Sequence, residues 1–227
     1  LLAKVRATLQ AGKLAPVRYR DPTSGEWREE MPRFGHLGAL LRFYAYRPES
    51  ASLLPLILHD AAQGRYESLL SQSRALSGDI GDSMALGMHL SVSCTEDPEI
   101  AIRPEDDATI MGNDIVEFIQ AQCAIWPKGK RDPDFRTPLR GDLPLLAISG
   151  ELDPVTPPRY GDEVVKTLPK ARHLVLPGQG HSVLTTGCMP KLFAQFVETA
   201  DAKNLDAECL KRLKPTPPFA GNYGWEP

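Results

Sequence analysis

Apolar positions in the first 80 residues recur mainly with the spacing of amphipathic helices. In each helical segment they return every three or four residues, which places them on one face. The segments expected to be helical are residues 1–10, 34–47, 53–63 and 65–77. Residues 17–27 instead alternate around a Pro/Gly turn, a pattern typical of a β-hairpin. This part of the chain is therefore expected to be mostly helical.

After Gly81 the pattern changes to strands that alternate with helices. Strands are expected at residues 86–93, 143–149 and 171–176, and helices at 104–125, 157–168, 182–187, 190–200 and 206–213. Strands separated by helices predict an α/β fold with a parallel sheet. A sheet of only three strands has an unpaired apolar edge, so a further segment is expected to cover it.

The change of pattern divides the chain into three expected parts. Residues 1–80 form a helical subdomain, residues 81–213 an α/β core, and residues 214–227 an extended tail rich in Pro and Gly. The chain opens in a helical pattern without Met and without a signal peptide, so residue 1 is not expected to be the natural start.

Composition narrows the classes of function. A chain of 227 residues with 42% hydrophobic content can bury a large core. The net charge is −3, and the Lys and Arg residues are scattered, which argues against a nucleic-acid partner. The apolar runs are shorter than the roughly 20 residues that span a membrane, so no membrane partner is expected.

The four cysteines leave two interpretations open. They are widely spaced and contain no Cys-x-x-Cys pair, which argues against a zinc site. Their even number suits two disulfides in an oxidising compartment, but four buried thiols in a cytosolic enzyme fit equally well.

The candidate chemistry lies where two successive expected strands end. Asp153 follows the apolar strand 143–149, and His181 follows the strand 171–176 after a turn that contains two glycines. Functional groups of open α/β sheets gather at the carboxyl ends of the strands. A histidine there can act as a base, and a carboxylate can orient it. Each residue alone is also a common turn former, but the order Asp then His is that of the α/β-hydrolases after their serine.

These segments resemble a known family. Ser149-Gly-Glu-Leu-Asp-Pro-Val-Thr-Pro157 and Gly178-Gln-Gly-His-Ser182 are similar to the acid and base motifs of α/β-hydrolases. The resemblance is closest to the tripeptidyl-aminopeptidase-like branch, which is related to proline iminopeptidase. Four further segments resemble that branch: Ser93-Cys-Thr-Glu-Asp-Pro98, Cys123-Ala-Ile-Trp-Pro127, Asp21-Pro-Thr-Ser-Gly25 and Leu53-Leu-Pro55.

The resemblance implies a fold and a set of roles. The chain would be the C-terminal part of an α/β-hydrolase sheet, with residues 1–80 as a helical cap and Asp153 and His181 as two members of a Ser-His-Asp triad. Glu96, or Asp97 beside it, would hold the free α-amine of a substrate. No cofactor and no metal is implied.

The resemblance also implies a pairing of the cysteines. Disulfides would join Cys94 to Cys123 and Cys188 to Cys209. Two disulfides would favour a periplasmic or secreted protein, with a cytoplasmic location as the alternative.

The nucleophilic serine is the main departure from the family. No Gly-x-Ser-x-Gly elbow is present, and the nearest sequence, Gly81-Asp-Ser83-Met-Ala85, precedes an expected strand instead of joining a strand to a helix. The serine is therefore expected upstream of residue 1, in a missing N-terminal half. Three functions stay open: a serine aminopeptidase that releases short N-terminal peptides, an esterase or other small-molecule hydrolase, and a non-catalytic binding module. The small substrate would be a peptide or an ester, and the role of Glu96 separates the first two.

Overall fold

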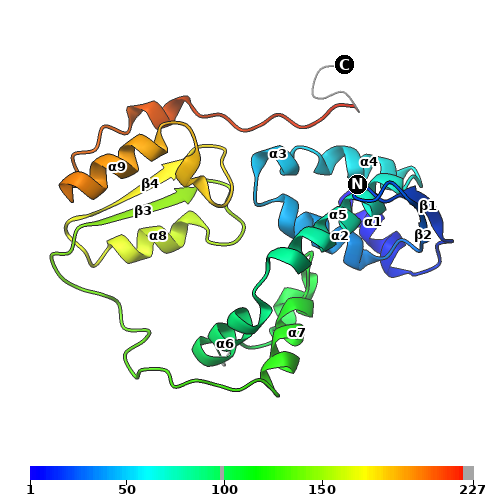
Figure 1. Cartoon of the computed structure of the whole chain (residues 1–227), viewed down its shortest axis with the longest axis horizontal. Coiled ribbons are helices and arrows are strands. Elements are labelled where there is room, and N and C mark those ends of the chain that lie inside the picture. The colour runs from blue at the N-terminus through cyan, green and yellow to red at the C-terminus, as the bar shows by residue number, and fades with distance from the viewer. Residues whose placement is uncertain (98–99, 222–227) are drawn as a thin grey trace. The chain divides into compact units, whose positions relative to one another are not determined.

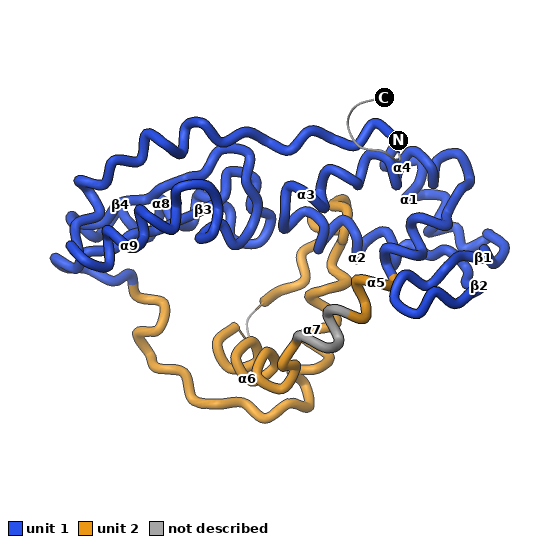
Figure 2. Tube along the Cα trace, turned by 45° about the horizontal axis from the view of Figure 1, so that its top comes forward, with its two compact units in different colours: residues 1–73, 138–227 blue, residues 74–137 orange. Residues whose placement is uncertain are grey.

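The computed structural model describes residues 1–97 and 100–221, except for the side chains of residues 79–83. Two compact units are formed (Figure 2). The first contains Leu1–Ser73 and Pro138–Pro227, and the second contains Arg74–Thr137. The expected division at residues 80 and 213 into cap, core and tail stays a prediction.

The N-terminal part of the first unit consists of short helices around one hairpin. Its elements are α1 (Leu2–Gln10), β1 (Val17–Arg20), β2 (Trp27–Glu30), α2 (Phe34–Tyr44), α3 (Pro48–Ala51), α4 (Leu54–Ala62) and the start of α5 (Glu67–Ser83). The helices and the antiparallel hairpin expected from the sequence are confirmed. Val5 and Leu9 of α1 are buried, as are Leu37 and Leu40 of α2, so the apolar helix faces form a core.

The C-terminal part of the first unit is a small α/β layer. Its elements are β3 (Leu145–Gly150), α8 (Pro158–Val165), β4 (Ala171–Leu176), the 3-10 turn η2 (Val183–Thr185), α9 (Met189–Thr199) and the 3-10 helix η3 (Glu208–Arg212). Strands β3 and β4 are parallel, and Figure 1 shows α8 and α9 on opposite sides of them. This is the βαβ connection that the strand–helix–strand pattern predicts.

The hydrophobic core of this layer lies between the strands and α9. Leu174 and Leu176 of β4 pack in one cluster with Met189 and Leu192 of α9. Burial of such side chains contributes roughly 1.5–3 kcal/mol each. The disulfide Cys188–Cys209 closes 21 residues at the start of α9, which adds about 3 kcal/mol in the chain-entropy model.

The second unit corrects one prediction. The prediction of a strand over residues 86–93 is wrong, because this segment belongs to the helix α6 (Leu86–Glu96). Its buried residues are Leu90 and Cys94, one helical turn apart, whereas Met88 and Val92 are exposed. Apolar residues at every second position imitate a strand, but the face that packs has helical spacing.

The partner of α6 is α7 (Asp114–Cys123), preceded by the 3-10 helix η1 (Pro104–Ala108). The single helix expected over residues 104–125 is therefore two shorter elements. A disulfide joins Cys94 of α6 to Cys123 of α7, and Ile119 and Trp126 pack beside it.

The parallel sheet is smaller than expected because α6 is helical. In the described residues, β3 and β4 form a two-strand parallel pair, and β1 and β2 a separate antiparallel pair. The protein is thus of mixed α/β class. No described helix is long and apolar enough to cross a membrane. The tail runs without helix or strand from residue 214 to 220, and the Phe219 N–H donates to the carbonyl of Ser52 at 2.9 Å. Residues 222–227 of the expected tail lie outside the described residues.

Candidate active site

Asp153 lies in a turn that holds its carboxylate from several sides. Oδ1 accepts the backbone N–H groups of Val155 at 2.8 Å and Thr156 at 2.9 Å. Oδ2 accepts the Thr156 hydroxyl at 2.9 Å and lies 2.9 Å from Nδ1 of His181. The side chain is only 4% exposed, so its orientation is fixed. Pro154 suits the bend, because it is the second residue of the turn that Asp153 opens and its ring fixes φ there.

These contacts set the charge of Asp153. Burial would by itself raise the pKa of its carboxyl group, because burial disfavours the charged form. Hydrogen bonds from the Thr156 backbone, the His181 ring, the Val155 backbone and the Thr156 hydroxyl act in the opposite direction. The pKa of Asp153 lies below its ordinary value as a result, and the carboxylate is ionised at neutral pH.

His181 is placed by a close approach of two backbone segments. A Cβ atom on Gly150, at the end of β3, would lie 1.9 Å from the carbonyl oxygen of Gly180. A Cβ atom on Gly180 would lie 2.3 Å from the carbonyl oxygen of Tyr46. Only glycine fits at either position. The His181 N–H then donates to the Tyr46 carbonyl at 2.6 Å, and the two rings meet edge to face at 5.4 Å.

The other imidazole nitrogen of His181 faces no hydrogen-bonding partner among the described residues. The side chain is 31% exposed. It borders a hollow of about 290 Å³, whose further lining includes Ile148, Leu184 and Phe193. With Nδ1 engaged by Asp153, Nε2 is the nitrogen that can exchange a proton with a substrate. The two residues that the sequence singles out as acid and base are therefore in direct contact.

A second hydrogen-bonded series of serine, histidine and aspartate lies in the same α/β layer, and the sequence pattern did not indicate it. Nδ1 of His173 is 2.8 Å from Asp162, and its Nε2 is 2.9 Å from the Ser149 hydroxyl. The strand register could have indicated it, because residues 149 and 173 lie on the same face of neighbouring strands.

This second series has the surroundings of a structural contact. The His173 side chain is 5% exposed and Ser149 9% exposed. A Cβ atom on Gly161 of α8 would lie 2.6 Å from the His173 ring, so the helix rests directly on the imidazole. A substrate cannot reach a hydroxyl group covered in this way. The arrangement links α8 to the two strands through the His173 ring, although Asp162 on α8 is itself 64% exposed.

Glu96 and Asp97 belong to the second unit, at the end of α6. The Glu96 carbonyl accepts a hydrogen bond from Arg131 at 2.7 Å. The Asp97 carboxylate pairs with Arg136 at 3.2 Å, with both side chains more than half exposed. An exposed ion pair of this kind contributes little to the free energy of folding. The expected role of both acids in holding a substrate amine stays a prediction.

The elbow-like segment around Ser83 has helical backbone, because Ser83 is the last residue of α5. Its side chain lies outside the described residues. The disulfides Cys94–Cys123 and Cys188–Cys209 are the pairs that the family resemblance implies. Among the described residues, no group of three or more His, Cys, Asp or Glu side chains is arranged to hold a metal ion.

An acid and a base at the carboxyl ends of two adjacent parallel strands, joined by a hydrogen bond, are the arrangement of the α/β-hydrolase class. Residues 108–209 match the model of a family described as TAP-like protein, which is an α/β-hydrolase family. This segment is therefore a TAP-like α/β-hydrolase domain, and it contains both Asp153 and His181. The chain has no significant match among curated proteins or solved structures.

Proposed function

We propose that the chain supplies the acid and the base of a serine hydrolase that acts on peptides. The observation that carries this proposal is the Asp153–His181 hydrogen bond, with the free imidazole nitrogen beside a hollow. The TAP-like family of residues 108–209 supports the hydrolase class.

The proposed mechanism follows from the position of the protons. The Asp153 carboxylate accepts a hydrogen bond from the Nδ1–H group of His181, so Nε2 is the basic nitrogen. Nε2 takes the proton of a serine hydroxyl as its oxygen attacks the scissile carbonyl carbon and forms a tetrahedral intermediate. The same proton then passes to the leaving amine as the carbon–nitrogen bond breaks. Water attacks the resulting acyl-enzyme by the same route and restores the serine. Asp153 stabilises the imidazolium in each step.

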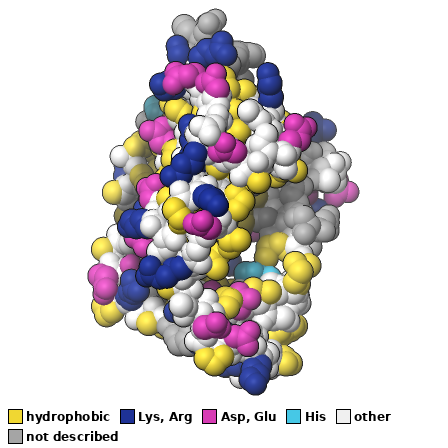
Figure 3. Space-filling model, turned by 90° about the vertical axis from the view of Figure 1, so that its left-hand side faces the viewer, with side chains coloured by type: hydrophobic (Ala, Val, Ile, Leu, Met, Phe, Trp, Pro, Cys, Tyr) yellow, Lys and Arg dark blue, Asp and Glu magenta, His cyan; other side chains and the backbone are white. Residues whose placement is uncertain are grey.

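The serine is proposed to lie in an N-terminal segment that precedes these 227 residues. Among the described residues, no serine is hydrogen-bonded to His181, and β3 pairs only with β4. Hydrophobic side chains are exposed among charged ones on the face in Figure 3. Near the hollow, the exposed ones include Leu184, Phe193 and Val197. A strand added at the free edge of β3 would cover such side chains.

The proposed substrate is a peptide with a free N-terminus, cleaved to release a short N-terminal fragment. Glu96, or Asp97, would pair with the ammonium group. In the complete enzyme, Glu96→Gln should raise KM for free-amine peptides and leave N-blocked esters unchanged. Equal effects on both substrates would favour the esterase alternative. The two disulfides support a periplasmic or secreted location.

The decisive experiment is fluorophosphonate labelling of the natural protein together with intact-mass measurement under reducing and non-reducing conditions. A labelled polypeptide longer than 227 residues, or a second labelled chain, would support the proposal. A protein of 227 residues that takes no label would leave the chain as a binding module and reject the hydrolase proposal.

A further inference from the structure

His181 also lines a second, polar hollow, which has no role in the proposed mechanism. Its volume is about 170 Å³, and its charged lining comes from Arg47, which precedes α3, and Glu49, which is in the first turn of α3. Hydroxyl groups of Ser182, Thr185 and Thr186 complete the polar lining. All these residues belong to the first unit.

The two charged groups of this hollow are not committed to other contacts. Arg47 and Glu49 are exposed, and their side chains have no hydrogen-bond or ion-pair partner among the described residues. Their backbones, by contrast, are fixed. The Arg47 N–H donates to Tyr44, and the carbonyls of both residues accept serine hydroxyls of α3 and its C-terminal end. The Arg47 guanidinium and the Glu49 carboxylate are therefore exposed side chains on a backbone segment that hydrogen bonds hold in place.

The same segment is tied to His181. The Tyr46 carbonyl, next to Arg47 in the chain, accepts the His181 N–H at 2.6 Å. The guanidinium of Arg42, the other nearby cation, lies 5.2 Å from the centre of the Tyr46 ring in a cation–π contact. The position of Arg47 and Glu49 relative to the imidazole is therefore set by a short backbone contact.

We infer that this hollow receives the residue that leaves after cleavage, in the form of an amino acid with a free carboxylate. This inference rests on the proposed hydrolase function. The Arg47 guanidinium would bind the carboxylate, because a guanidinium can donate two parallel hydrogen bonds to it. The leaving group takes one proton from His181 and departs as a neutral amine; a second proton from water would then give the ammonium that pairs with Glu49. The volume is on the order of five water molecules, which suits one small residue.

The inference adds a requirement on the substrate that the triad alone does not impose. A peptide with a free carboxylate one residue beyond the scissile bond would be preferred over its amide. Because the proposed enzyme releases a short N-terminal fragment, recognition of both charges of a single leaving residue would restrict cleavage to short peptides.

The test is calorimetric titration of the complete natural protein with three probes: N-acetylalanine, alaninamide and alanine. N-acetylalanine carries only the carboxylate, alaninamide only the ammonium, and alanine carries both. Arg47→Gln should weaken the binding of N-acetylalanine about fivefold, which is the upper range for an exposed ion pair, and leave the binding of alaninamide unchanged. Glu49→Gln should weaken the binding of alaninamide and leave that of N-acetylalanine unchanged. The binding of alanine should be weaker in both variants. Arg47→Lys should restore part of the carboxylate binding.

The control variants are Arg18→Gln, whose guanidinium lies over the Trp27 ring, and Glu198→Gln on α9. Neither should change any affinity. The inference is overturned if N-acetylalanine does not bind, or if Arg47→Gln and Arg18→Gln weaken it equally. Binding needs no nucleophile, so this result is independent of the labelling experiment. A labelled enzyme without probe binding rejects the inference about the hollow alone, whereas probe binding without labelling rejects the hydrolase function and, with it, the assignment of the bound residue as a cleavage product.

Discussion

Two Asp-Pro turns in this chain have the same local hydrogen bonds and different partners. In both, Oδ1 of the aspartate accepts the backbone N–H groups two and three residues further on. The distances are 3.0 and 3.2 Å at Asp21, and 2.8 and 2.9 Å at Asp153. Both carboxylates are buried, and both have a pKa below the ordinary value. The turn itself is therefore a local consequence of sequence.

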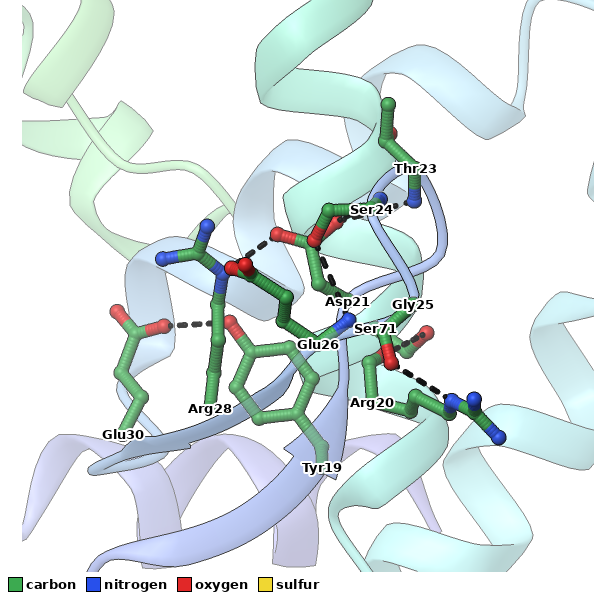
Figure 4. A network of polar contacts seen from close by, with 10 residues as sticks. All are labelled: Tyr19, Arg20, Asp21, Thr23, Ser24, Gly25, Glu26, Arg28, Glu30 and Ser71. Carbon is green, nitrogen blue, oxygen red and sulfur yellow. Dashed lines mark hydrogen bonds and ion pairs between the residues drawn. The ribbon is translucent and has the colours of Figure 1, made fainter.

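The partner of the second carboxylate oxygen separates the two turns. Oδ2 of Asp21 pairs with the Arg28 guanidinium across the hairpin (Figure 4). Oδ2 of Asp153 meets the His181 imidazole from the next strand. Arginine keeps its charge at every accessible pH, so the first pair can only hold the hairpin. Histidine can gain and lose a proton near neutral pH, so the second pair can take part in catalysis.

The largest expected effect comes from neutralising the two aspartates in turn. In the complete enzyme, Asp153→Asn should lower kcat by about 10⁴-fold, because the amide no longer selects the productive histidine tautomer. Asp21→Asn should leave kcat unchanged once the protein is folded. Turnover of a peptide substrate at fixed temperature measures both. If the two variants lost activity equally, the role assigned to Asp153 would be wrong.

The comparison also shows what the sequence can predict. The places of Asp153 and His181 after two apolar runs predict the site, and the N-terminal helices, the hairpin, β3 and β4 follow the periodicity of their residues. The helix α6 was not predicted, because apolar residues at every second position suggested a strand. Leu90 is buried because α6 packs against α7 and a disulfide joins the two helices. Both contacts are long-range in sequence, so the local pattern does not reveal them.

The Ser149–His173 contact escaped prediction for a similar reason. It depends on the register of β3 against β4 and on the close approach of α8 at Gly161. Neither is encoded in the local pattern. The contact of His181 with Tyr46 joins segments that are 135 residues apart, by the difference of their numbers, and no periodicity signals it.

Gly180, next to His181, and Gly25, in the hairpin turn of Asp21, should respond differently to replacement by alanine. Gly180→Ala would place a Cβ atom against the Tyr46 carbonyl, which is backbone and cannot move aside. The resulting shift of His181 should lower kcat by about 10²-fold, the cost of a displacement near 1 Å. Gly25→Ala meets only the Arg20 side chain at 3.8 Å, and its positive φ of 73° should cost about 1 kcal/mol of stability. Kinetics and thermal melting of both variants distinguish these outcomes. A Gly180→Ala enzyme with normal kcat would contradict this account of the loop.

The Thr156 hydroxyl and the His181 ring share Oδ2 of Asp153, whereas at the hairpin the described partner of Oδ2 of Asp21 is Arg28. The Thr156 hydroxyl donates to Oδ2 of Asp153 at 2.9 Å. Thr156→Val keeps the shape and removes this bond, so kcat should fall about fivefold, the equivalent of one net hydrogen bond of about 1 kcal/mol. Ser24→Ala, at the matching place in the hairpin turn, should leave kcat unchanged. A loss as large as that of Asp153→Asn would mean that Thr156 itself orients the histidine.

The smallest expected effect is that of Asp21→Asn on the free energy of unfolding, and its pH dependence should appear only at acidic pH. Hydrogen bonds from the Ser24 backbone and then from Arg28 lower the pKa of Asp21 to about 2, whereas in the unfolded chain it is about 3.9. A lowered folded-state pKa means that the carboxylate stabilises the fold above pH 3.9, and that this contribution is lost as the pH falls toward 2. The stability difference between the wild type and Asp21→Asn should therefore be constant above about pH 5 and shrink steadily below pH 4. Urea unfolding between pH 2 and 7 measures it. A difference that did not depend on pH would show that the turn is held by its backbone alone, and that the charge on Asp21 contributes nothing to it.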